Sequence, residues 1–202
     1  MAPTRRHFGR NAHRPNVPDT SPLLPKERKT RIQQIVGSFL FYGRALDGTT
    51  QHVLNDMGST QSKPTINTEN KSNHFLDYMS THSDAKIQYY ASDMILNVHS
   101  DVLYLTASRG SIRAAGHYFL GSDPKNGQPI KLNGAIHVLC SILKLVAASA
   151  AKGELGILFI NAQLTRIIRL ILEEMGHPQP PTLMHVDNTT VIGIVNNTIK
   201  QQ

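Results

Sequence analysis

Three acidic residues in the carboxy-terminal half stand where the surrounding pattern is apolar. Asp101 closes an apolar stretch that begins at Met94, Asp187 directly follows the apolar stretch 183–186, and Glu154 is expected in the first turn of the longest predicted helix. Carboxylates brought together from strand ends and a packed helix repel one another until a cation neutralises them. Hard divalent cations prefer such oxygen ligands. Asp101, Glu154 and Asp187 are therefore candidate metal ligands.

Each of these acids also has an ordinary structural explanation. A carboxylate in the first helical turn is stabilised by the helix dipole by about 0.3–1 kcal/mol, which accounts for Glu154. An aspartate at a strand end often begins a turn or caps a helix, as Asp187 would for a helix starting at Asn188. His99 shares one side of a strand with Asp101, so a metal or proton-relay role competes with a structural one. The separations of 53 and 33 residues between the acids form no motif, and both explanations stay open.

The elements that must position these acids alternate between strands and helices. Strand-like periodicity begins near Met94, and the helical pattern that follows the third strand stops at Gly176 with Pro178 behind it. This order predicts an α/β domain. The predicted strands are Met94–Leu105, Ala114–Gly121, Ala135–Leu143 and Leu183–Val186, and the predicted helices are Ala150–Met175 and Asn188–Lys200.

The amino-terminal part has a different organisation. Residues 1–28 contain five prolines and little to bury, which favours a disordered or extended leader. Apolar residues between 32 and 54 recur at helical steps, but three glycines leave open whether they form one long helix or two shorter ones. A loop is predicted over 58–70 and a short helix over 71–81. The predicted units are a leader at 1–30, a helical segment at 31–90 and an α/β domain at 93–202.

Charge and composition narrow the class of protein. The net charge is +7, and residues 1–31 contribute most of it with eight Lys and Arg against Asp19 and Glu27. This leader is either an arm that binds polyanions or a solvated tail. The single cysteine, Cys140, excludes a disulfide scaffold and a cysteine-based zinc site. With no apolar run judged long enough for a membrane span, we expect an intracellular protein of the cytoplasm or nucleus, without a membrane partner.

Six stretches of the sequence together match one known family. The later four are VHSDVLYL (98–105), AAGHYFLGS (114–122), NGAIHVLCSILKLVAASAAKGELGILF (133–159) and LEEMGHPQPPTLMHVDNTTVIGIVNNTIKQ (172–201). The earlier two are IQQIVGSFLFYGRALD (32–47) and LDYMSTHSDAKIQYYASDMIL (76–96). The later four resemble the ribonuclease H region at the end of the Pol polyprotein of copia-type LTR retrotransposons, and the earlier two resemble the connection segment that precedes it. The fold that this resemblance implies is a ribonuclease-H-like mixed sheet flanked by helices.

The resemblance implies a site in which carboxylates bind two Mg²⁺ ions and the RNA strand of an RNA–DNA hybrid is hydrolysed. Asp101 matches the aspartate of the family's His-Ser-Asp motif, Glu154 the second glutamate of its Glu-Ala-Glu-Leu motif, and Asp187 the aspartate of its Thr-Asp-Asn motif. Arg109 and Arg113 are expected in the turn after the first strand, as phosphate contacts or as solvated arginines. The implied partners are the hybrid or another nucleic acid, and the rest of a Pol polyprotein.

The sequence also departs from the family pattern. The family's fourth acid lies on a closing helix, and the sequence ends at Gln202 before it, so we expect a truncated domain with one metal ligand missing. Val102 and Leu103 replace small residues after the first aspartate, and Lys152 replaces the first glutamate of the helix motif. The alternative function is a retroelement remnant that binds nucleic acid without cleaving it, or that is inactive.

Overall fold

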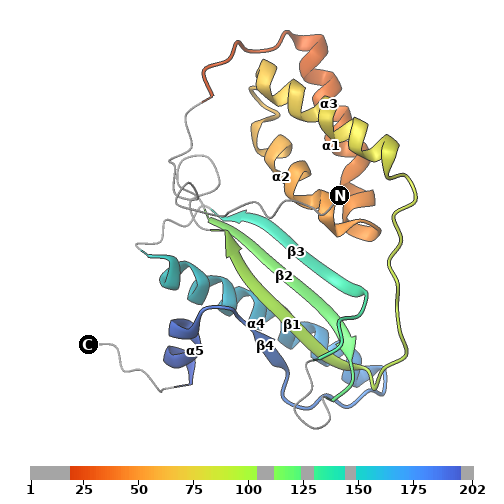
Figure 1. Ribbon diagram of the computed structural model, residues 1–202, viewed down its shortest axis with the longest axis vertical. Coiled ribbons are helices and arrows are strands. Elements are labelled where there is room, and N and C mark those ends of the chain that lie inside the picture. The colour runs from red at the N-terminus through yellow and green to blue at the C-terminus, as the bar shows by residue number, and fades with distance from the viewer. Residues whose placement is uncertain (1–18, 104–111, 124–129, 144–148, 197–202) are drawn as a thin grey trace, which may run out of the picture.

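The computed structural model describes residues 19–103, 112–123, 130–143 and 149–196. Two groups of elements make up this part of the chain (Figure 1). A helical unit comes first, and a mixed sheet with two further helices follows. The helical unit consists of α1 (Lys26–Ala45), the 3₁₀ turn η1 (Gly48–Thr50), α2 (Gln51–Thr60) and α3 (Ile66–Thr81).

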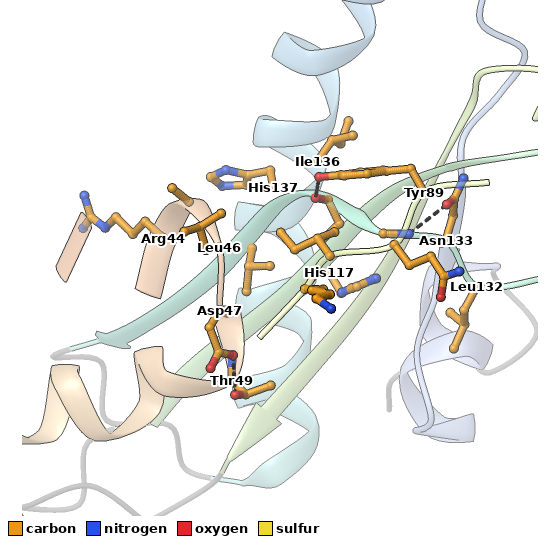
Figure 2. Close-up of a pocket in the computed structure, with 18 of the residues that line it drawn as sticks. Arg44, Leu46, Asp47, Thr49, Tyr89, His117, Leu132, Asn133, Ile136 and His137 are labelled. Carbon is orange, nitrogen blue, oxygen red and sulfur yellow. Dashed lines mark hydrogen bonds between the residues drawn. The ribbon is translucent and has the colours of Figure 1, made fainter. Parts of the chain in front are cut away.

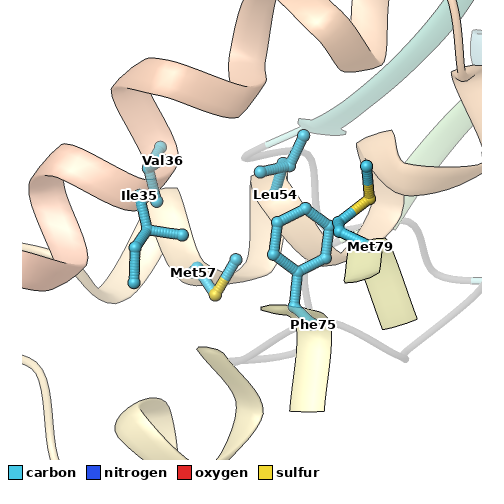
Figure 3. Close-up of a cluster of buried hydrophobic side chains, with 6 residues drawn as sticks. All are labelled: Ile35, Val36, Leu54, Met57, Phe75 and Met79. Carbon is cyan, nitrogen blue, oxygen red and sulfur yellow. The ribbon is translucent and has the colours of Figure 1, made fainter. Parts of the chain in front are cut away.

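The helical unit has a hydrophobic core of its own. Phe75 of α3 lies against Phe39 of α1, with the two ring centroids 5.1 Å apart in an edge-to-face arrangement. Such pairs add to the stabilisation that burial itself provides. Six buried side chains from the three helices converge in this core (Figure 3), namely Ile35, Val36, Leu54, Met57, Phe75 and Met79.

The helical unit differs from the sequence prediction at its polar boundaries. The pattern over 32–54 belongs to two helices, because the chain breaks at Asp47, whose carboxylate accepts a hydrogen bond from the Thr49 backbone N–H at 3.1 Å. The loop predicted over 58–70 is too long: only residues 61–65 are outside the helices, since α2 reaches Thr60 and α3 begins at Ile66. Thr65 caps α3 by accepting from the Thr68 backbone N–H. Capping by polar side chains makes such residues part of a helix start, where composition alone indicates a loop.

The leader predicted at 1–30 is also too long. Helix α1 starts at Lys26, and Arg28 forms an ion pair with Glu69 of α3. Lys29 Nζ donates to the Ser62 carbonyl oxygen at 2.7 Å, and Leu23 forms a β-bridge with Thr65. Residues 19–30 therefore belong to the helical unit. Residues 1–18 of the predicted leader lie outside the described residues.

The second group is an α/β unit with a four-stranded mixed sheet, as the sequence predicted at this level. The strands are β1 (Ile95–Leu103), β2 (Ile112–Gly121), β3 (Ala135–Leu143) and β4 (Leu183–His185), in the order β3-β2-β1-β4. The first three pair antiparallel, and β4 pairs parallel to β1. Helix α4 (Ala150–Glu174) crosses between β3 and β4, and α5 (Thr189–Val195) packs on α4. Figure 1 shows α4 running along the sheet and α1–α3 grouped beyond β3.

Helix α4 covers one face of the sheet and hides most of the apolar side chains there. Leu96 and Val98 of β1 pack with Leu172 of α4, and Ile157 packs with Ile112 of β2. By length and composition alone, the helix over 151–174 could also cross a membrane, because an 18-residue window of it has a mean hydropathy of 1.6. Arg166 and Arg169 interrupt the segment, as the sequence prediction stated, so it contains no uninterrupted apolar run of that length. The contacts with the sheet give the apolar face of α4 a structural role.

A buried polar residue sets the position of α4 on the sheet. Asn161 is fully buried and donates to Ser100 Oγ at 2.8 Å and to the Ala115 carbonyl oxygen at 3.0 Å. The Tyr118 hydroxyl donates to Asn161 Oδ1 at 2.7 Å. Buried amides are costly unless they are hydrogen bonded, so this network favours one register of helix on sheet.

Candidate functional site

Asp101 projects from the face of the sheet that α4 leaves uncovered. Side chains alternate along a strand, and the bond between Ser100 and Asn161 shows that Ser100 points toward α4. Asp101 therefore points the other way, as does His99. Asp101 is exposed and lines a cavity of about 280 Å³ together with His52 of α2 and His117 of β2.

Three histidines form a row across this uncovered face. His99 of β1 pairs with His117 of β2 on one side and with His185 of β4 on the other. The rings of His99 and His185 stack with centroids 4.7 Å apart. Burial lowers the pKa of His99, and the neighbouring His185 and His117 lower it further. Of these three, only His99 is a candidate from the sequence, because the strand register that brings His117 and His185 beside it is not visible there.

Asp187 lies at the same end of the sheet as Asp101. Each follows its paired histidine by two residues, Asp101 after His99 and Asp187 after His185, and their strands run parallel. Asp187 is exposed and is not the cap of α5. Asn188 takes that role, accepting through Oδ1 from the Thr190 N–H at 2.9 Å and from the Val191 N–H at 3.3 Å. The expectation that Asp187 caps this helix is therefore wrong.

Glu154 lies in the second turn of α4, one turn later than predicted. The helix begins at Ala150 and is capped by the Ser149 side chain, so a first-turn dipole interaction does not explain Glu154. It precedes Asn161 by two turns and thus shares the face of α4 that meets the sheet. Its Oε2 atom is buried and has no hydrogen-bond partner within the described part of the chain. An unpaired buried carboxylate oxygen is unfavourable, so its position calls for a ligand or a functional explanation.

The three acids are not gathered into one cluster. Glu154 approaches the sheet from the face that α4 covers, whereas Asp101 projects from the opposite face. Among the residues that the structure describes, no group of three or more His, Cys, Asp or Glu side chains is placed to hold a metal ion. Of the three, Glu154 fits metal binding best, because its buried oxygen lacks a partner.

The two arginines have different outcomes. Arg109 lies outside the described residues. Arg113 belongs to β2 and not to the preceding turn, and only 2% of it is exposed, so the prediction of a solvated turn residue is wrong. It donates to the His52 carbonyl oxygen at 3.1 Å and lies 3.7 Å from Asp56 Oδ1. Burial lowers the pKa of His52, and the charge of Arg113 lowers it further. Arg113 therefore joins the sheet to α2, and its role as a phosphate contact stays a prediction.

A second cavity adjoins the one that holds Asp101. It has a volume of about 670 Å³ and lies between the end of α1, the segment 86–90 and β3 (Figure 2). The two cavities share Gly48, His117 and Val138 as lining residues. The uncovered face of the sheet and the helical unit thus enclose a continuous series of hollows that includes Asp101.

Comparison with known proteins leaves the chain without a match, whether against protein-family models, curated proteins or solved structures.

Proposed function

We propose that the chain is a retrotransposon-derived ribonuclease H that hydrolyses the RNA strand of RNA–DNA hybrids with a divalent metal. The proposal starts from the resemblance in the sequence, which covers both the helical unit and the sheet. The mixed sheet with a helix on one face agrees with the ribonuclease-H-like architecture that the resemblance implies. The single observation that carries the chemistry is the buried, unpartnered Oε2 atom of Glu154 near the start of α4.

Asp101, Glu154 and Asp187 are the residues proposed to hold Mg²⁺. Two ions would activate a water and stabilise the leaving oxygen in an in-line displacement. The residues of the chain itself supply negative charge at one end of the sheet, where β1 and β4 both end. The exposed carboxylates of Asp101 and Asp187 are accessible to a nucleic acid, and Glu154 supplies a buried oxygen.

A second candidate is a protein that binds nucleic acid without cleaving it. The observation that favours it is the placement of Asp101 and Glu154 on opposite faces of the sheet. A two-metal reaction requires ligands on both sides of one scissile phosphate. The cavities beside Asp101 would serve binding alone equally well.

The two candidates are separated by an activity assay on the full chain. A hybrid with a fluorescent label on its RNA strand is incubated with Mg²⁺, and cleavage is compared between the unmodified chain and Asp101→Asn, Glu154→Gln and Asp187→Asn. Each substitution is expected to lower the rate by more than the roughly 10–100-fold seen for residues that only orient a metal ligand. Asp93→Asn, an exposed acid just before β1, is the matched control and leaves the rate unchanged.

A thermal unfolding measurement accompanies the assay. Mg²⁺ is expected to raise the melting temperature of the unmodified chain and not that of Glu154→Gln, because a ligand stabilises only the fold that binds it. A folded protein that shows neither cleavage nor stabilisation by Mg²⁺ would overturn the nuclease and leave the binding protein.

A further inference from the structure

The cavity of about 670 Å³ in Figure 2 has no role in the proposed cleavage. Its walls come from three separate places: the turn after α1, the segment 86–90, and β3 with the residues before it. Tyr89 and Tyr90 line it, and the basic residues Arg44 and Lys86 line it too. Aromatic rings beside cations are the means by which proteins hold single-stranded nucleic acid without reading its sequence.

The two tyrosines are exposed and yet firmly held. Their exposed fractions are 57% for Tyr89 and 45% for Tyr90. The Tyr89 hydroxyl donates to the Ala135 carbonyl oxygen at 2.9 Å. The Tyr90 backbone N–H donates to Asn133 Oδ1 at 2.8 Å, and Asn133 Nδ2 donates back to the Tyr90 carbonyl oxygen at 2.9 Å. The hydroxyl bond thus holds the Tyr89 ring, and the other two bonds hold the Tyr90 backbone. Groups that are already ordered lose little freedom when a ligand binds, which favours binding.

Gly134 permits this arrangement. A Cβ atom at this position would lie 2.7 Å from the Gln88 carbonyl oxygen and 2.9 Å from Tyr89 Cδ1. Real Cβ atoms do not approach backbone oxygens that closely, so any other residue would push the segment 87–89 away from β3. The backbone is thus built to hold the tyrosines against the edge of the sheet.

The charge around the tyrosines favours an anion. Arg44 and Lys86 line the cavity, and Lys131 Nζ lies 4.1 Å from the centroid of the Tyr90 ring. Asp47, the single acid in the described lining, is 8% exposed, and its carboxylate accepts from the Thr49 N–H at 3.1 Å. Because this carboxylate is turned inward, the charge presented to a ligand is positive.

The larger cavity lies within a short distance of Asp101 along strand β2. Asn133 donates to the Leu120 carbonyl oxygen at 2.7 Å, and Asp101 pairs with Ala115 on the same strand, β2. Five residues of strand span about 17 Å. The shared lining residues Gly48 and His117 connect the two hollows over this length.

We propose that the Tyr89–Tyr90 surface, formed by Arg44, Lys86, Tyr89, Tyr90 and Lys131, binds single-stranded nucleic acid. Bases stack on the two tyrosines, the cations contact the phosphates, and the strand continues toward Asp101. The inference rests on the proposed function for the class of ligand, and it does not require cleavage.

Binding is measured by fluorescence anisotropy on the full chain in EDTA, where no metal-dependent cleavage takes place. The probes are labelled oligo(dT) and oligo(U) of about 10 nucleotides, within the site sizes of such surfaces. Tyr90→Ala is expected to weaken binding about 5- to 150-fold, the range for loss of one stacked base, whereas Tyr90→Phe keeps the ring and the affinity. Phe41→Ala removes a ring that is 79% exposed on α1 and is the control, with no expected effect.

The salt dependence of binding tests the cations separately. Lys86→Gln is expected to reduce the slope of log K against log salt by about 0.7, the value for one phosphate contact on a single strand. Lys63→Gln, an exposed lysine in the α2–α3 turn, leaves the slope unchanged. This comparison decides the question even if Tyr90→Ala does not fold.

The outcomes distinguish this inference from the nuclease. Equal affinities of Tyr90→Ala and Tyr90→Phe, or equal salt slopes of Lys86→Gln and Lys63→Gln, would overturn the binding surface. Binding that depends on Tyr90 and Lys86 in a protein that cleaves no hybrid supports the surface and removes the nuclease. Hybrid cleavage by a protein whose single-strand binding depends on neither Tyr90 nor Lys86 supports the nuclease and overturns the binding surface.

Discussion

The imidazole rings of His99 and His185 stack with their centroids 4.7 Å apart, although 86 residues separate them in the sequence. The parallel pairing of β1 with β4 places them directly opposite each other. The same pairing brings Asp101 and Asp187, each two residues farther on, to one end of the sheet. This one register thus positions both the histidine row and two of the three candidate acids.

The histidine pair makes stability depend on pH. The pKa of His99 lies below its usual 6.5, first because of burial and then because of His185 and His117. The folded chain therefore favours neutral His99, and its contribution is present above about pH 6.5 and lost as the pH falls below it. We expect the free energy of unfolding to drop less between pH 7.5 and 5.5 in His99→Gln than in the unmodified chain. Urea unfolding at both pH values measures this, and His74→Gln, remote from the row, serves as control.

A direct titration tests the electrostatic part. Replacing His185 by Gln removes the electrostatic interaction with His185 that helps to lower the pKa of His99, and is expected to raise that pKa toward its usual value. The imidazole proton resonances of His99 in an NMR titration report this shift. No movement in His185→Gln would show that the two rings are not neighbours in solution.

Removing the Asn161 side chain should be among the most destabilising single changes. Asn161→Ala removes the donor to Ser100 Oγ and to the Ala115 carbonyl oxygen, and leaves the Tyr118 hydroxyl only the Asn161 backbone carbonyl oxygen at 3.3 Å. With about 1–3 kcal/mol for each buried group left unsatisfied, a loss of about 3 kcal/mol in the free energy of unfolding is expected. Denaturant unfolding measures it. Gln163→Ala, on the exposed side of α4, should change stability by less than about 0.5 kcal/mol.

Two glycine-to-alanine substitutions should change the free energy of unfolding in opposite directions. A Cβ at Gly116 would lie 2.5 Å from Asn161 Oδ1, so Gly116→Ala should cost about 1–3 kcal/mol through overpacking. A Cβ at Gly37, inside α1, meets nothing within 4 Å, so Gly37→Ala should stabilise by about 0.5–1 kcal/mol. Thermal unfolding of the two variants checks the prediction. A stable Gly116→Ala would mean that α4 does not lie on β2 as described.

The joint between the sheet and the helical unit depends on Asp56. Asp56→Asn removes the charge next to the buried Arg113 and should cost about 2 kcal/mol, less than the roughly 3–5 kcal/mol of a fully buried pair because Asp56 is 32% exposed. Lys71 is the other partner of Asp56, and the Lys71 side chain is 51% exposed. Lys71→Gln should therefore lower the free energy of unfolding by less than about 1 kcal/mol. Similar losses for both variants in urea unfolding would contradict the buried role of Arg113.

The sequence alone determined most of the secondary structure of the sheet unit. Strand-like periodicity predicted β3 at its observed bounds, β2 and β4 within two residues, and the start of β1 within one. The predicted end of β1 at Leu105 lies outside the described residues. Helix α4 was predicted to within one residue, because a long helical period with a glycine stop is a local signal. The prediction failed where polar residues begin helices, as at Thr65, since a cap and a loop have the same composition.

The candidate acids were also recognised from the sequence, but their arrangement was not. The Asn161–Ser100 bond shows that Ser100 faces α4, so the next residue, Asp101, faces the opposite side of the sheet. A shift of β1 by one residue would turn Asp101 toward α4. Likewise, only the strand register brings His117 and His185 beside His99, and only packing against α2 buries Arg113. Periodicity and capping depend on a few neighbouring residues. The direction in which a side chain points, the strand register and burial depend on contacts between distant segments, so only the tertiary structure decided them.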